Sequence, residues 1–183
     1  MADRYFLTLA KYNAWANARL YDACAELPEA EYMKERPAFF RSLHGTLNHI
    51  LVGDRIWVAR IERKPAPKVT LDQILYGDLV ALRVARIAED EHLVNVVSEI
   101  SVRALDQPLA YTTTEGTRQK TVLRFVLAHL FNHQTHHRGQ AHGLLSQPGL
   151  DTQDSRVRRP CRAELGAALR EPLPSLVQSA ATG

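Results

Sequence analysis

The stretch AHLFNHQTHHRGQAHG, residues 128–143, decides the fold class. Apolar residues in and around it recur at the three- and four-residue spacing of an amphipathic helix. The buried face is marked by Val126, Leu130, Ala141 and Leu144. We expect this helix to begin at a cap on Thr121 and to continue to about Ser146, because Pro148 follows closely.

Working outward, the same periodicity predicts three more long helices. The first spans residues 3–27, and the second runs from an N-cap at Ser42 to about Arg63. The third starts at a capping box over residues 70–73 and continues to Ile100. β-Branched residues around a glycine turn predict a small hairpin before the last helix. Four long helices without a repeating strand pattern indicate an all-α four-helix bundle.

The length and composition suit one globular domain followed by a tail. The chain has 183 residues, of which 45% are hydrophobic and 23% charged, as in ordinary folded proteins. We assign residues 1–150 to the bundle. Over residues 151–183 the composition shifts to Arg, Pro, Ala and Ser, which predicts a separate tail with only a short helix near 163–169.

Charge and cysteine content exclude several classes of protein. The formal net charge is only +3, and much of the excess lies in the tail, so we expect no nucleic-acid partner. No signal peptide or membrane-spanning run is present, and we expect no membrane association. The two cysteines, Cys24 and Cys161, form no disulfide or zinc pattern. A reducing, cytoplasmic location is therefore expected.

Five of the eight histidines lie within residues 128–143, so their positions around this helix decide which of them can act together. At about 100° per residue, His133 and His137 fall on the buried face. His136 and His142 turn away, and His129 lies at the edge. An i, i+4 pair of histidines places two imidazoles one turn apart, where both can reach a single metal ion.

A third ligand should come from a neighbouring helix, and His49 is the best candidate. Small residues beside it, including Gly53, would leave room for an ion. His44 is expected on a polar stripe and His92 on an acidic surface. Gln134 stands where an HExxH protease has its glutamate base, which excludes that class.

A structural interpretation of these histidines also stands. Inward histidines are often hydrogen-bonded core residues without any metal, since a buried imidazole needs only a polar partner. Three of them in an apolar interior would each need such a partner, because unsatisfied buried polar groups are costly. The pattern alone leaves metal binding and a structural role both open.

The chain resembles the DinB/YfiT-like family of metalloenzymes. The resemblance is carried by residues 129–140, by Leu47-Asn48-His49 leading to residues 54–57, and by residues 12–17, and it extends over about residues 3–150. It implies an up-down-down-up four-helix bundle, a three-histidine site for nickel or zinc, and a homodimer. Its ligand set maps onto His49, His133 and His137.

The resemblance also suggests a function, because some relatives are transferases or isomerases that use a low-molecular-weight thiol. We therefore expect a metal-dependent enzyme that transfers such a thiol or activates water. The alternative is a stress-associated protein that binds metal or a small ligand without turnover. Three neutral imidazoles leave a position free for water or substrate, which is typical of catalytic sites.

Other polar residues are candidates for supporting roles around the site. Gln140 and Asn13 face inward and are predicted to contact the ligand histidines or the substrate. Asp54 projects away from His49, so it can orient that ring only indirectly. Arg86 and Asp90 form an i, i+4 pair, which we interpret as a structural ion pair rather than a clamp for an anionic substrate.

Overall fold

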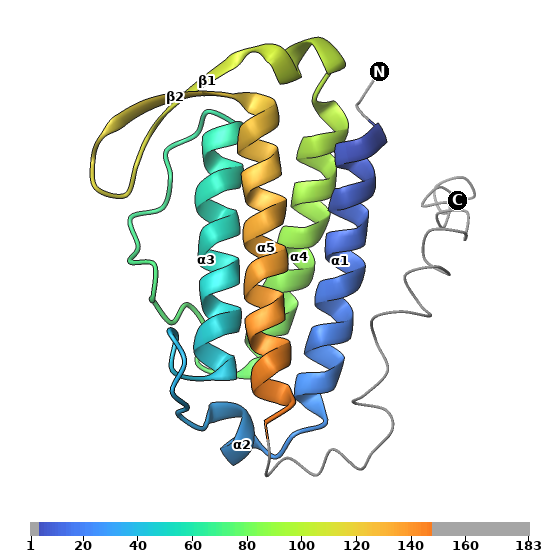
Figure 1. Ribbon diagram of the computed structural model, residues 1–183, viewed down its shortest axis with the longest axis vertical. Coiled ribbons are helices and arrows are strands. Elements are labelled where there is room, and N and C mark those ends of the chain that lie inside the picture. The colour runs from blue at the N-terminus through green and yellow to red at the C-terminus, as the bar shows by residue number, and fades with distance from the viewer. Residues whose placement is uncertain (1–3, 148–183) are drawn as a thin grey trace, which may run out of the picture. The chain divides into compact units, whose positions relative to one another are not determined.

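The computed structural model describes residues 4–147, and four long helices pack together in it. These are α1 (Arg4–Ala25), α3 (Leu43–Ile61), α4 (Leu79–Glu99) and α5 (Leu123–Leu145). α3 and α4 run in one direction and α1 and α5 in the other, which is the expected up-down-down-up arrangement (Figure 1). The all-α bundle is confirmed. The tail over 151–183, with its predicted short helix, lies outside the described residues.

The core divides along the bundle into two apolar clusters with a polar layer between them. One cluster gathers around Leu43, Leu47, Leu51 and Leu82. The other gathers around Val58, Leu93, Leu127 and Leu130. Between them on the same helices lie buried polar residues, namely Asn13, Asn17, Asp54, Arg86, Asp90 and Gln134. Over residues 4–147, no helix is long and apolar enough to cross a membrane.

The second helix of the bundle begins as predicted, but the third begins later. Ser42 caps α3 by accepting a hydrogen bond from the Gly45 backbone N–H at 2.9 Å. The capping box over residues 70–73 forms only a turn, and α4 starts at Leu79 with Asp78 as its N-cap. The prediction failed because residues 62–78 run back along α3. There Asn48 Oδ1 accepts hydrogen bonds from the backbone N–H groups of residues 75 and 76.

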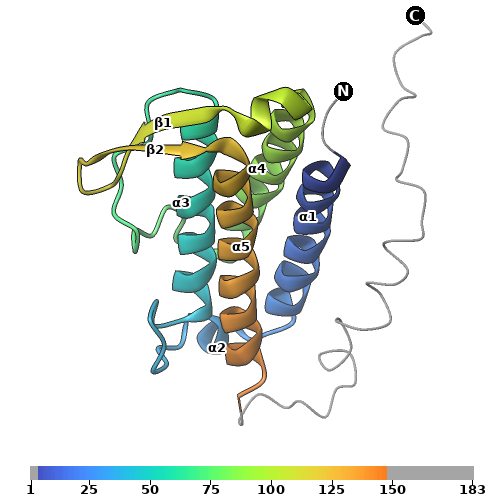
Figure 2. The same ribbon diagram turned by 45° about the horizontal axis from the view of Figure 1, so that its top comes forward.

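The predicted hairpin is confirmed at one end of the bundle. A 3₁₀ turn (Val102–Asp106) leads into β1 (Pro108–Thr112), which pairs antiparallel with β2 (Arg118–Val122). The turn between the strands uses Gly116 at φ 85°, a left-handed conformation that favours glycine. Figure 2 shows the hairpin beside the end of α3.

Two further differences from the sequence prediction occur at helix ends. The predicted cap at Thr121 is wrong, because that residue still pairs in β2 and α5 begins at Leu123. The backbone N–H of Leu123 instead donates to the Gln107 carbonyl at 3.0 Å. A short helix, α2 (Glu29–Met33), was not predicted, and it brings Tyr32 into the core beside α3.

Candidate metal centre

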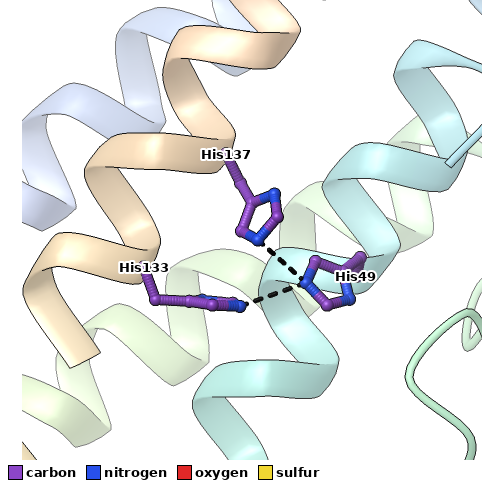
Figure 3. Close-up of side chains that lie close together, drawn as sticks. All are labelled: His49, His133 and His137. Atoms are coloured by element: carbon purple, nitrogen blue, oxygen red, sulfur yellow. Dashed lines mark hydrogen bonds between the residues drawn. The ribbon is translucent and has the colours of Figure 1, made fainter. Parts of the chain in front are cut away.

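His49 on α3 meets His133 and His137 on α5, and the three rings converge (Figure 3). His49 Nε2 lies 3.1 Å from Nε2 of His133 and 3.1 Å from Nε2 of His137. One ligand atom from each ring lies within 4.8 Å of the others. The structure therefore brings together the three histidines selected from the sequence, and this cluster can hold a metal ion.

The contacts of Nδ1 in His49 and His137 determine which ring nitrogen carries the proton. His49 Nδ1 lies 2.7 Å from the Leu71 carbonyl oxygen, and His137 Nδ1 lies 2.8 Å from Gln140 Oε1. Both oxygens only accept hydrogen bonds, so Nδ1 is the donor in each ring. In a neutral imidazole this leaves Nε2 with a bare lone pair. The lone pairs of His49 and His137 thus face each other across 3.1 Å.

Protonation does not relieve this opposition near neutral pH. Burial and the neighbouring histidines lower the pKa of His133 from 6.5 to about 3. Burial likewise lowers the pKa of His137 to about 4, although the hydrogen bond with Gln140 acts in the opposite direction. Burial also lowers the pKa of His49. The rings are therefore neutral at pH 7. A cation between them is the natural complement to their lone pairs.

Two glycines of α3 allow this packing. A Cβ on Gly53 would lie 2.7 Å from His133 Cε1, so only glycine leaves space for that ring. A Cβ on Gly45 would collide with the Phe40 carbonyl oxygen. Because Gly45 has no side chain, the backbone of Phe40 can approach α3. The Phe40 ring stacks on the His49 ring, with centroids 3.8 Å apart. The small residues beside His49 thus make room for His133 and Phe40.

Phe40 and the Leu71 carbonyl are parts of the site that the sequence did not indicate. The Leu71 contact is made by backbone, which leaves no signal in the residue type. Phe40 stands two residues before the Ser42 cap in the sequence, but the position of its ring in space depends on how the preceding loop folds. Phe40 also packs edge-on against His137, with centroids 5.5 Å apart.

The two predicted supporting residues lie in different surroundings. Gln140 Oε1 accepts a hydrogen bond from His137 Nδ1, and the Gln140 amide nitrogen Nε2 lies 3.1 Å from His136 Nε2. Asn13 instead donates to Asp90 Oδ1 at 3.3 Å and accepts a hydrogen bond from Arg138. The structure thus places Gln140 against a ligand histidine and Asn13 in the polar layer of the bundle.

The polar layer is organised around Arg86, which is 2% exposed. Its guanidinium lies 2.5 Å from Asp54 Oδ2 and 3.0 Å from Asp90 Oδ1, which confirms the predicted ion pair and adds a partner from α3. Gln134 donates to Asp54, and Asn17 donates to Asp90 at 2.9 Å. Burial alone would lower the pKa of Arg86, but the two carboxylates raise it above its ordinary range.

His44, His92 and His129 do not belong to the cluster. His44, which was expected on a polar stripe, is buried, and its Nδ1 lies 2.8 Å from the hydroxyl of Tyr32 on α2. His92 lies on the surface, 3.3 Å from Glu62. His129 stands beside the cluster, with its ring centroid 6.2 Å from that of His133. His44 is thus a hydrogen-bonded core histidine.

Fold and site together define a helical bundle with a three-histidine cluster on two adjacent helices. The model of the DinB family matches residues 1–160, and the chain belongs to the DinB family. It is also similar to Protein DinB of Bacillus subtilis (strain 168), with 30% identity over 156 residues. That alignment covers 81% of this chain and 88% of the relative.

Proposed function

We propose that the cluster of His49, His133 and His137 holds one divalent transition-metal ion, nickel or zinc, and that the protein is a metal-dependent enzyme. The observation that carries this is the opposition of Nε2 lone pairs at 3.1 Å in rings whose Nδ1 groups already donate elsewhere. Imidazole nitrogen suits both metals, so the donor set fits the ion.

Three protein ligands favour catalysis over a purely structural role, because they leave a coordination position for an exogenous group. A metal ion at such a site lowers the pKa of a thiol or a water molecule and so supplies a nucleophile at neutral pH. The protein holds the ring orientations through the Leu71 carbonyl and Gln140. Phe40 covers one face of His49, while His133 and His137 remain partly exposed to an approaching ligand.

A pocket next to the cluster supports a small-molecule substrate. It has a volume of about 330 Å³, and its lining combines apolar residues such as Phe39, Phe40 and Leu144 with polar ones, namely Thr46, Gln140 and Gln147. Phe40 and Gln140 also contact ligand histidines. A molecule in this pocket would therefore lie against the residues that orient the site, and its size suits a small organic compound.

The resemblance to thiol-dependent relatives favours a low-molecular-weight thiol as one substrate. In the proposed transfer, the sulfur forms a bond to an electrophilic carbon of the second substrate. The leaving group departs with the electron pair of the broken bond, and the thiol proton passes to water. Activation of water for hydrolysis is the other use of the same site.

The test combines metal analysis with a turnover screen on the purified protein. Nickel and zinc are quantified, and cysteine is offered with 1-chloro-2,4-dinitrobenzene before and after removal of metal with dipicolinate. We expect turnover that is lost with the metal and restored by nickel or zinc. Metal bound without turnover across a panel of thiols and esters would instead support a binding protein without catalysis. Absence of metal binding would contradict both.

We also propose a cytoplasmic homodimer. The family resemblance suggests it, and α4 carries a row of exposed apolar residues, namely Val80, Val84 and Ile87. Light scattering on the purified chain should give twice the 20.6 kDa mass of one chain. A Val84→Glu variant should shift the mass toward the monomer. A monomeric wild-type protein would contradict the proposal.

A further inference from the structure

A second cavity, of about 420 Å³, lies between the end of α3 and β1. Figure 1 shows these two elements at the hairpin end of the bundle. The lining includes Arg60 from the last turn of α3, Arg63 and Lys64 from the segment that follows it, and Ala110, Tyr111 and Thr112 from β1. Arg60 follows His49 by eleven residues, so the two positions are roughly 16 Å apart along the helix.

Arg60 is the most informative residue of this cavity. Its side chain is only 8% exposed, and its guanidinium lies over the rings of Trp57 and Tyr111, at 4.6 and 5.0 Å from their centroids. Within residues 4–147, Arg60 Nε is buried and has no hydrogen-bond partner. A buried donor on a charged group without an acceptor is costly, so the guanidinium would gain from an acceptor bound in the cavity that it lines.

The charges around the cavity favour an anion as that partner. Three of the lining residues are cationic, and none of the described lining residues carries a carboxylate. Lys64 has an exposed ion pair with Glu62, whereas burial lowers the pKa of Arg60, as expected for a charge without a close counter-ion. The nearest negative charge to Arg60 on the hairpin is Glu115, which is fully exposed at the turn.

The helix end does not oppose an anion strongly. The C-terminal carbonyls of a helix carry partial negative charge. Here the carbonyls of Val58 and Ala59 accept hydrogen bonds from the backbone N–H groups of Glu62 and Lys64, at 2.9 and 2.8 Å. The Arg60 carbonyl accepts from the Arg63 N–H at 3.0 Å. The cationic side chains therefore dominate the local charge.

We propose that this cavity binds a small organic anion, a phosphate ester or a carboxylate, whose charged group accepts a hydrogen bond from Arg60. Arg63 and Lys64 supply further positive charge at the rim, and the ring of Tyr111 forms an apolar wall. This ligand site is separate from the histidine cluster and does not depend on the metal.

The test is an NMR titration of the full-length, ¹⁵N-labelled protein at constant ionic strength. Phenyl phosphate and benzoate are the probes. The Arg60 Nε–H resonance reports on the guanidinium in the wild type, and the backbone amide resonances of Ala110, Tyr111 and Thr112, which line the cavity, give the affinity in every variant. We expect a saturable shift of the Arg60 Nε–H resonance and binding about tenfold weaker in Arg60→Met, the loss of one charge-assisted hydrogen bond. Lys64→Gln, at an exposed position, should weaken binding by about two- to threefold. Arg83→Met removes the same charge from the α4 surface and should leave affinity unchanged.

The outcomes separate the ligand classes and the two sites. Tighter binding of phenyl phosphate supports a phosphate ester, and tighter binding of benzoate supports a carboxylate. No shift at Arg60 with either probe would overturn the proposal, as would equal weakening by Arg83→Met and Arg60→Met. His133→Ala should bind the probes like the wild type. Loss of anion binding in that variant would contradict a separate site, whereas failure of the metal proposal alone would leave this one intact.

Discussion

The bundle buries two polar clusters side by side, and they differ in the charge of the groups that meet in them. In the layer around Arg86, the guanidinium lies between the carboxylates of Asp54 and Asp90, so opposite charges meet. In the histidine cluster, neutral rings present lone pairs to one another. The clusters are adjacent in sequence as well, since Gly53 precedes Asp54 and His133 precedes Gln134.

From this difference we infer a structural role for the layer around Arg86, and it supports the proposed metal site at the histidine cluster. The buried charge of Arg86 has its counter-charges within the fold, and removing one partner of a buried ion pair is strongly destabilising. In the histidine cluster, packing holds lone pairs close together, and a bound cation would relieve their repulsion. Substitutions in the first cluster should therefore affect folding, and substitutions in the second should affect metal affinity.

Asp54→Ala should give the largest effect. It leaves the buried Arg86 with Asp90 as its one remaining carboxylate partner, and loss of a partner from a buried ion pair costs about 3–5 kcal/mol. Urea unfolding of the metal-free protein measures this. Asp22→Ala breaks the exposed pair with Arg83 and should cost about 0–1 kcal/mol. Equal stabilities of the two variants would remove the contrast between the clusters.

Gly53→Ala should lower metal affinity while leaving the fold intact. The added Cβ would lie 2.7 Å from His133 Cε1 and displace that ring, and we expect a loss of roughly 10–100-fold, as for disturbed ligand orientation. Gly139→Ala on α5 is the matched control, because nothing lies within 4 Å of its added Cβ. Competition titration against a chelator gives both affinities. Unchanged affinity in Gly53→Ala would mean that the ring position is not critical.

The sequence predicted the parts of this site that depend on helical periodicity. His133 and His137 could be placed on one face of α5, and His49 on a buried face of α3, because successive turns repeat regularly. The parts that depend on tertiary contacts were not predictable. Asn48 holds residues 75 and 76 outside a helix, and the same loop delivers the Leu71 carbonyl to His49. The contact of His44 with Tyr32 was not predictable either, because α2 was not predicted.

Gln140→Ala should have a smaller effect on the metal site. It removes the oxygen that accepts from His137 Nδ1, so the ring loses its fixed tautomer and metal affinity should fall by about tenfold. Gln119→Ala, on the exposed face of the hairpin, is the control. If both variants bind metal like the wild type, Gln140 does not orient His137.

The pH dependence of folding gives a further prediction for the histidine cluster. The pKa values of His133 and His137 are about 3 and 4 in the folded protein, below the ordinary value of 6.5. As the pH falls below about 6.5, the unfolded chain gains protons at these positions and the folded metal-free protein does not. Stability should therefore fall from pH 7 toward pH 4. A His133→Ala/His137→Ala variant should show a shallower decline in urea midpoint, and an identical decline would contradict the assigned pKa values.

Metal stoichiometry in matched histidine variants tests the central claim most directly. Metal-free wild-type protein is titrated with zinc and with nickel against a competing chelator, alongside His133→Ala and His92→Ala. His92 lies on the surface beside Glu62, so its loss leaves the cluster complete. We predict one tightly bound ion per chain in the wild type and in His92→Ala, and no tight binding in His133→Ala. Equal binding by His133→Ala and wild type would contradict a metal site at His49, His133 and His137.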